Sequence, residues 1–263
     1  MHHVSQEQSK WTEGPLEMDT QILVSLSHQV AMRRQMDIIA NNIANMNTTG
    51  YKRESIMFSE YLSQVDGSLP KDFREVSFVQ EKGIARQMTN GELSATGNQL
   101  DIALEGPGMF KVRKMDGTIA FTRNGHFAIS ENNELVTPQG HVILDDGDAP
   151  IEIPITSNGF KVAEDGTVSA DEVGEIAKIA VVEFENYGAM RKIGDNLYTS
   201  EELGTPAEGY LVTQGMLETS NVSPVLEVSN MIELSRSYAS TSRTMEKLQE
   251  TQSSAINKIT KFA

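Results

Sequence analysis

Apolar residues recur at helical spacing near the start of the chain, from Thr20 to about Asn45. The steps between them are mostly three residues, four residues or a multiple, which is the period of an amphipathic α-helix. No proline or glycine interrupts the stretch, and Gly50 follows Asn47 as a stop signal. We therefore expect a long N-terminal helix within residues 18–50, with one apolar face formed by Ile22, Leu26, Val30, Met36, Ile39 and Ile43.

The C-terminal end repeats this pattern over residues 220–263. Neither proline nor glycine occurs after Pro224, which suits the first turn of a helix, with Asn221 or Ser223 as candidate caps. The apolar positions fall near a 3.5-residue repeat, and they form only a thin stripe that suits a helix partner better than a globular core. The positions are Val228, Met231, Ile232, Tyr238, Met245, Leu248, Ala255, Ile256 and Ile259.

The middle of the chain has a different pattern of apolar and turn-forming residues. Between residues 91 and 219, short apolar runs such as 176–184 alternate with Asp-Gly and Asn-Gly pairs, for example Asp116-Gly117 and Asp165-Gly166. This pattern predicts many short strands joined by tight turns. Residues 51–90 have no sustained period and contain Gly67 and Pro70, so we expect an irregular arm or linker there. The polar residues 1–17 are expected to be a disordered extension, with Met18 as the natural start of the chain.

The predicted fold class is α+β, with a central all-β domain between two long terminal helices that form a coiled-coil-like pair. Neither helix can bury a narrow apolar face on itself. The helices must therefore pair with each other, with another copy of the chain, or with a different protein. This requirement indicates a subunit of an assembly.

Composition narrows the class of function. The formal net charge is -15, and residues 91–219 contribute -14 of it, which argues against nucleic-acid binding and suggests that the middle and the ends do different jobs. The chain has no cysteine, which is compatible with an oxidising compartment. We find no apolar run long enough for a transmembrane helix and expect no cleaved secretory signal.

The sequence offers few residues that could form a catalytic or metal-binding site. His126 and His141 are the histidines of the predicted β domain, and neither has a partner at metal-ligand spacing. The acidic run 145–148 lacks the later glutamate of a calcium loop. We predict no enzyme activity, no catalytic residue, no cofactor and no metal. A hydrolase using two of the many carboxylates stays open as an alternative, as does a secreted binding protein on a coiled-coil stalk.

Three blocks of sequence resemble the bacterial flagellar rod and hook proteins, in the order found in that family. The first block is 35–52, with Asn41, Asn42, Asn45 and then Gly50-Tyr51-Lys52. The second block opens the β region and comprises Gly91-Glu92-Leu93, Thr96-Gly97-Asn98, Leu100 to Gly106, Phe121 to Gly125, and Phe127. The third block comprises Gly194 to Tyr198, Gln214-Gly215, Leu217-Glu218, Ser220-Asn221-Val222, Met231-Ile232, Arg236 and Tyr238. Within the family, the opening residues 18–37 most resemble proximal-rod members, with distal-rod members as the close alternative.

The resemblance implies a structural subunit of the flagellar basal body, whose terminal helices form an inner tube with the β domain outside. It implies export through the flagellar type III apparatus into the periplasmic space without a cleaved signal. The implied partners are copies of the chain and the rod proteins FlgB, FlgC and FlgG, with no nucleic acid and no small-molecule substrate. Torque transmission for swimming motility would follow from self-assembly into a stiff tube.

This resemblance suggests a role for the asparagines at the end of the first predicted helix. Asn41, Asn42 and Asn45 flank the Ile39–Ile43 stripe, and neutral amides can fix register between packed helices at a lower desolvation cost than charges. The alternative is that they end and cap the helix, which is the role we assign to Asn47. The predicted assembly interface comprises Ile22, Leu26, Met36, Ile39, Asn41, Asn42, Ile43, Asn45, Met231, Ile232, Arg236, Tyr238 and Leu248.

Overall fold

The structure, a computed structural model, describes residues 13–64, 75–154, 159–171, 173–202 and 204–262. Within them the chain is α+β, because a helix at each end flanks a mainly β middle. Two compact units are present. Unit 1 takes its described residues from 1–40, 56–83 and 225–263, and unit 2 takes them from 41–55 and 84–224.

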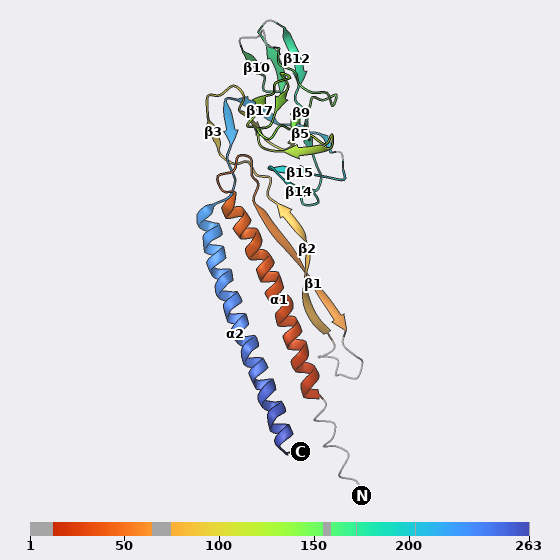
Figure 1. Ribbon diagram of the computed structural model, residues 1–263, viewed down its shortest axis with the longest axis vertical. Coiled ribbons are helices and arrows are strands. Elements are labelled where there is room, and N and C mark those ends of the chain that lie inside the picture. The colour runs from red at the N-terminus through yellow and green to blue at the C-terminus, as the bar shows by residue number, and fades with distance from the viewer. Residues whose placement is uncertain (1–12, 65–74, 155–158, 172, 203, 263) are drawn as a thin grey trace. The chain divides into compact units, whose positions relative to one another are not determined.

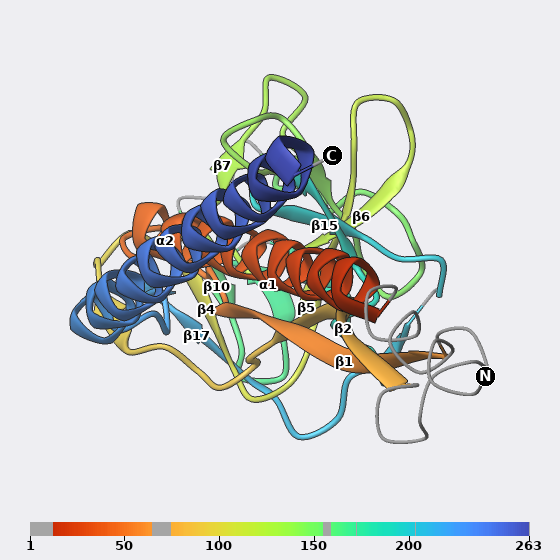
Figure 2. The same cartoon turned by 90° about the horizontal axis from the view of Figure 1, so that it is seen from below.

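Unit 1 contains most of helix α1 (Glu13–Ala44), most of strands β1 (Glu54–Gln64) and β2 (Glu75–Arg86), and helix α2 (Pro224–Phe262). In two perpendicular views α1 lies between α2 and the β1–β2 pair, and the two helices run in opposite directions (Figures 1 and 2). One contact between the helices joins Ser235 Oγ to Met36 Sδ at 3.9 Å. Segments from three distant parts of the sequence thus build one unit.

The β1–β2 pair corrects the sequence prediction of an irregular arm over residues 51–90. The two strands form a two-stranded sheet, whose arrows point in opposite directions in Figure 1. Their sequences mix Ser, Glu and Gln with apolar residues and do not alternate regularly, so periodicity did not reveal them. An isolated pair of strands is only marginally stable, and here Phe58 and Val79 face residues of α1.

Helix α1 begins earlier than the sequence suggested. Residues 13–17 are helical, so the expectation of a disordered extension up to residue 17 is wrong for these five, and residues 1–12 lie outside the described chain. Pro15 falls in the first turn, where the missing N–H carries no penalty. The helix ends at Ala44, and turns lead to Gly50, whose φ of +66° is left-handed. A Cβ at Gly50 would lie 2.4 Å from the Arg123 carbonyl oxygen, so this close approach requires glycine.

Unit 2 holds the short strands predicted for the middle of the chain. The largest sheet has the order β14-β15-β6-β5-β9-β8-β7 and also includes β13 and β16. Smaller sheets are β10-β11-β12, β17-β4 and β18-β3. The strands are β3 (Leu93–Ala95), β4 (Ile102–Glu105), β5 (Met109–Arg113), β6 (Ile119–Thr122), β7 (Ala128–Ile129), β8 (Leu135–Val136), β9 (Val142–Ile143), β10 (Phe160–Val162), β11 (Thr167–Ala170), β12 (Gly174–Lys178), β13 (Val181–Glu183), β14 (Arg191–Gly194), β15 (Leu197–Thr199), β16 (Thr205–Pro206), β17 (Leu211–Gln214) and β18 (Met216–Glu218).

The predicted tight turns are present between adjacent strands. Gly117 (φ +83°) follows Asp116 between β5 and β6, and Gly166 (φ +87°) follows Asp165 between β10 and β11. In each turn the aspartate accepts a hydrogen bond from the backbone N–H two residues later. The strands enclose one main hydrophobic core, whose fully buried members include Ile102, Phe110, Val112, Leu135, Ile143, Ile151, Val168 and Ile179.

Candidate assembly site

Asn42 lies in unit 2 and bonds inside its own chain. Its side-chain amide donates to the Glu54 carbonyl at 2.8 Å, and its oxygen accepts from the Glu54 N–H at 3.0 Å and the Tyr51 hydroxyl at 3.1 Å. The residue is fully buried. These contacts favour a role inside the chain, since the amide is enclosed by the turn that follows α1. A role of Asn42 in setting register between neighbouring subunits stays a prediction.

The other asparagines of this stretch differ in exposure. Asn41 and Asn47 are exposed, and Asn45 is half-buried. The Asn45 amide donates to the Asn41 carbonyl at 2.8 Å, and its oxygen accepts from the Thr48 hydroxyl at 3.2 Å. Asn45 therefore satisfies backbone and side-chain groups at the helix end, which was the alternative role considered for it.

A buried ionic cluster lies next to this turn. Glu218 accepts from the Lys52 ammonium at 2.6 Å and from Arg123 Nε at 2.6 Å, and it also accepts from the Gly91 N–H at 2.8 Å. Arg123 also donates to the carbonyls of Leu104, Gly106 and Gly108. Burial lowers the pKa of Lys52, and Arg123 lowers it further while Glu218 opposes the shift. One carboxylate thus balances two buried cations.

Asn221 extends this cluster to the last residues before α2. Its side-chain oxygen accepts from the Arg53 N–H at 2.7 Å, and its amide donates to the carbonyls of Gln87 and Thr89 at 2.8 and 2.9 Å. We call Asn42, Lys52, Arg123, Glu218 and Asn221 the polar cluster. It ties the segments near residues 42–54, 87–91, 123 and 218–221 together within unit 2.

The predicted interface residues of the helices divide into covered and exposed positions. On α1, Ile39 is buried, Ile22, Met36 and Ile43 are half-buried, and Leu26 is 47% exposed. On α2, Met231, Tyr238 and Leu248 are half-buried, whereas Ile232 and Arg236 are exposed. The single chain therefore covers part of the predicted interface and leaves part of it open.

Helix α2 has two distinct faces. Its less exposed positions recur at alternating steps of four and three residues: Glu227, Met231, Leu234, Tyr238, Thr241, Met245, Leu248 and Gln252. We call this row the inner seam. Val225, Val228 and Ile232 are 79%, 45% and 49% exposed and lie on a different face, because successive residues turn by about 100°. We call these three residues the outer stripe.

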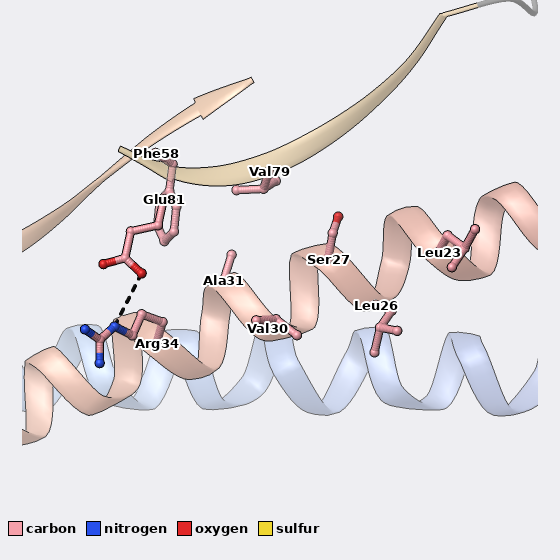
Figure 3. A pocket seen from close by; sticks show the side chains of 9 residues that line it. All are labelled: Leu23, Leu26, Ser27, Val30, Ala31, Arg34, Phe58, Val79 and Glu81. Carbon is pink, nitrogen blue, oxygen red and sulfur yellow. Dashed lines mark ion pairs between the residues drawn. The ribbon is translucent and has the colours of Figure 1, made fainter. Parts of the chain in front are cut away.

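A groove opens between α1 and the β1–β2 pair, and it is entirely within unit 1 (Figure 3). Its volume is about 340 Å³. Leu23, Leu26 and Val30 line it from α1, and they are 54%, 47% and 62% exposed. Phe58 and Val79 line it from the strands, and an ion pair between Arg34 and Glu81 at 3.5 Å lies at one end.

Three family descriptions match the chain. "Flagella basal body rod protein" matches residues 22–52, "Flagellar hook protein FlgE/F/G D1 domain" matches residues 103–170, and "Flagellar basal body rod FlgEFG protein C-terminal" matches residues 213–258. The flagellar basal-body rod protein FlgF of Caulobacter vibrioides is 38% identical over 251 residues, which cover 93% of this chain and 100% of the relative. The chain belongs to the flagellar FlgE/F/G rod and hook protein family.

Members named FlgF and FlgG both resemble the chain. FlgF of Mesorhizobium japonicum is 32% identical over 241 residues, covering 91% of this chain and 97% of the relative. FlgG of Buchnera aphidicola subsp. Schizaphis graminum is 32% identical over 238 residues, covering 82% of this chain and 90% of the relative. The resemblance to the rod and hook family predicted from the sequence is confirmed.

The polar cluster is the feature of this family member that sequence reasoning missed. In the sequence, Lys52, Arg123 and Glu218 stand out only as parts of the family blocks, whereas Asn42 is also a predicted interface residue and Asn221 a candidate helix cap. The structure brings these three blocks into contact. The available signal was a polar or charged residue in each of the separated blocks, with opposite charges on Lys52 and Glu218.

The histidines and acidic residues of unit 2 are the candidate sites that the sequence suggested, and one histidine pairs with a carboxylate. His126 Nδ1 lies 2.6 Å from a carboxylate oxygen of the buried Asp101, but the imidazole is exposed at the surface of the turn. Within the described residues, no group of three or more His, Asp or Glu side chains is arranged to hold a metal ion. In the same residues, neither helix has an apolar stretch that could cross a membrane.

Proposed function

We propose that this chain is a non-enzymatic axial subunit of the flagellar basal-body rod. The supporting observation is an apolar surface on both helices that the single chain leaves open, in a protein of the rod and hook family. In this proposal α1 and α2 pair in a coiled-coil-like manner along the inner seam. Their open faces then join copies of the chain and the rod proteins FlgB, FlgC and FlgG.

Within the rod we assign the chain to the proximal, FlgF-type position. The match to FlgF of Caulobacter vibrioides along that relative's full length supports the assignment. FlgG, at the distal rod, is the alternative, since its matches reach 32% identity over most of the chain.

The proposal includes a mechanical role and a route. Many interlocked helices would give the tube the stiffness needed to transmit torque for motility. The chain would reach the periplasmic space through the flagellar type III export apparatus without cleavage of a signal peptide. An unfolded chain could pass a narrow channel, and the helices would acquire their full packing on assembly.

Electron microscopy of basal bodies from cells that lack this chain tests the proposal. We expect rings with a missing or stunted rod, because an axial subunit cannot be bypassed. A stop close to the ring would favour the proximal position, and a stop further out would favour FlgG. Complete rods, hooks and filaments would contradict the proposal.

A further inference from the structure

We infer that the β14–β15 hairpin clamps the segment that follows α1, so that load on this helix passes into the largest sheet of unit 2. The inference rests on the proposed function, because a rod subunit has to bear torque, and it names the residues that carry load out of the helix. The last residues of α1, 41–44, belong to unit 2 together with the segment 45–53. This segment contains no helix or strand, so contacts with other parts of unit 2 must hold it in place.

The first contact of the clamp is a hydrogen bond from the tip of the hairpin. Asn196 Nδ2 donates to the Thr49 carbonyl at 2.8 Å. The tip is a two-residue turn in which Asp195 and Asn196 have left-handed φ of +51° and +57°, a conformation that these residue types tolerate. The Asn196 carbonyl accepts from the Thr122 hydroxyl at 3.0 Å. The residue that holds Thr49 is thus itself held by strand β6.

The second contact joins strand β14 to the helix end through one aromatic ring. The Lys192 ammonium lies 4.2 Å from the centre of the Tyr51 ring, which is within the range of a cation–π interaction. Tyr51 is fully buried, and its hydroxyl donates to Asn42 in the last turn of α1 at 3.1 Å. The tyrosine therefore binds α1 with its hydroxyl and the hairpin with its ring.

A buried arginine ties the start of β1 to the same hairpin. Arg86 Nη2 pairs with Glu54 Oε1 at 2.7 Å, and its guanidinium carbon lies 4.5 Å from the centre of the Tyr198 ring in β15. The guanidinium also donates to the carbonyls of Tyr187 and Met190, which precede β14. The chain is therefore held by the hairpin region within the segment 45–53 and again directly after it.

The hairpin can bear load because it is part of the largest sheet. Strand β15 pairs with β6, with Leu197 opposite Thr122 and Tyr198 opposite Phe121. Leu197 and Tyr198 are buried in the two hydrophobic clusters of unit 2. Packed interiors are dense, so a push on one strand is passed to its neighbours. Force on Thr49 is therefore spread over several strands.

The clamp can be removed without disturbing the polar cluster, which binds the same segment through other groups. Glu218 accepts from the Gly50 N–H with its backbone carbonyl at 2.8 Å, and this bond involves neither hairpin residue. Lys192 is exposed and Asn196 is half-buried, so replacing them leaves the core filled. A double variant at these two positions therefore tests the clamp alone.

Hydrogen exchange of the full chain, followed by mass spectrometry, tests the local part of the inference. Backbone N–H groups in the segment 45–51 donate hydrogen bonds, among them those of Thr48, Gly50 and Tyr51, so their exchange reports local opening. We expect Lys192→Gln combined with Asn196→Asp to speed exchange in this segment about ten-fold, since each change removes one contact. Exchange in β5 should keep the parental rate.

Two single variants separate the clamp from a general effect of charge. Arg191 is the exposed neighbour of Lys192 in β14, and its side chain points to the other face of the strand. Arg191→Gln removes the same charge and should leave exchange in the segment 45–51 at the parental rate. Lys192→Arg keeps a cation that can stack on the Tyr51 ring, so this variant should exchange like the parent.

Swimming under load tests the path of force through the clamp. Cells with the double variant should assemble complete rods and swim at the parental speed in dilute medium. In viscous medium, where the rod carries more torque, we expect them to lose speed relative to the parent. Cells with Arg191→Gln should match the parent in both media.

Failure of the inference is distinguishable from failure of the proposed function. Unchanged exchange in the segment 45–51 of the double variant would overturn the clamp. An equal rise across the whole of unit 2 would also overturn it, because the contacts would then only stabilise the fold. A local rise with parental swimming in viscous medium would overturn the path of force. If the unaltered chain is absent from basal bodies, the proposed function itself fails.

Discussion

Buried polar residues carry much of the specificity at the scale of single residues. The buried Asn42 and the half-buried Asn221 each bind backbone groups of other segments, and Glu218 joins Lys52 to Arg123. Such groups are expensive to bury unless every donor and acceptor is matched. They therefore specify which segments meet more than they add net stability.

Replacing Asn42 with alanine should destabilise unit 2. The change leaves the buried Glu54 N–H and carbonyl without their partner, so we expect a loss of about 2–4 kcal/mol in the free energy of unfolding. Urea denaturation of the full chain measures it. Asn47→Ala, at an exposed position of the same stretch, should change the free energy by less than about 0.5 kcal/mol. Equal effects of the two changes would contradict the internal role of Asn42.

Removing the anion of the ionic cluster should lower the free energy of unfolding more than removing one of its two cations. Glu218→Gln removes the anion and leaves Lys52 and Arg123 as uncompensated buried cations, which should cost about 3–5 kcal/mol. Lys52→Met leaves the Arg123–Glu218 pair balanced, so we expect a cost below about 2 kcal/mol. Thermal and urea unfolding would measure both variants. A larger loss for Lys52→Met would show that Lys52 is the more important partner.

Tyr198 should make the protein sensitive to alkaline pH. Burial raises the pKa of Tyr198 to about 12, whereas an exposed tyrosine in the unfolded chain titrates near 10. The folded state therefore keeps a proton that the unfolded state loses. This contribution to stability is complete below pH of about 10 and is lost as pH rises towards 12, by about 1.4 kcal/mol per pH unit.

Tyr198→Phe checks this pH dependence. The Tyr198 hydroxyl is buried and has no hydrogen-bond partner among the described residues, so the variant should be at least as stable as the parent at neutral pH. Between pH of about 10 and 12 its stability should fall less steeply than that of the parent. Parallel curves for the two proteins in urea titrations at several pH values would refute the assignment.

Helix α2 illustrates how one element can serve two purposes. The inner seam is the less exposed face of α2 and contains Thr241 and Gln252, so it is less apolar than a tight core. The outer stripe is a separate surface at the start of the same helix. A substitution on one face should therefore be separable from a substitution on the other.

Leu234→Ala and Val225→Ala test that separation in the purified chain. Leu234 is half-buried on the inner seam, and its truncation should cost about 1–2 kcal/mol in thermal unfolding followed by circular dichroism. Val225 is 79% exposed, so its truncation should cost less than about 0.5 kcal/mol in the same experiment. Similar losses for both variants would mean that the two faces do not act separately.

The sequence predicted the elements better than it predicted their contacts. Helical periodicity revealed α1 and α2, and Asp116-Gly117 marked a real turn, because these signals depend on neighbouring residues. Strands β1 and β2 were missed, since their pairing and their cover by α1 come from residues distant in sequence. The partners of Asn42 could not be read from helix geometry, because the chain has to turn back through Gly50 before Glu54 reaches the amide. Lys52 and Glu218 are 166 residues apart, and no local pattern joins them.

At the scale of the whole molecule, the two units differ in net charge. Most of the negative charge belongs to residues 91–219, which lie in unit 2, while the terminal helices are nearly neutral. A charged surface keeps a β-rich unit solvated and discourages unwanted contacts, whereas neutral helices can approach one another.

The division into units also determines the order in which they can be completed during synthesis. Every segment of unit 2 has been made once the chain reaches Pro224, but unit 1 still lacks α2, whose 39 residues come last. At a synthesis rate of about 5–20 residues per second, the ribosome needs about 2–8 seconds more to supply them. During that interval α1 has no inner seam to meet, and the outer stripe does not yet exist. Of the open apolar surfaces, the outer stripe on α2 is thus the last to be made, which delays association through it in the cell that makes the chain.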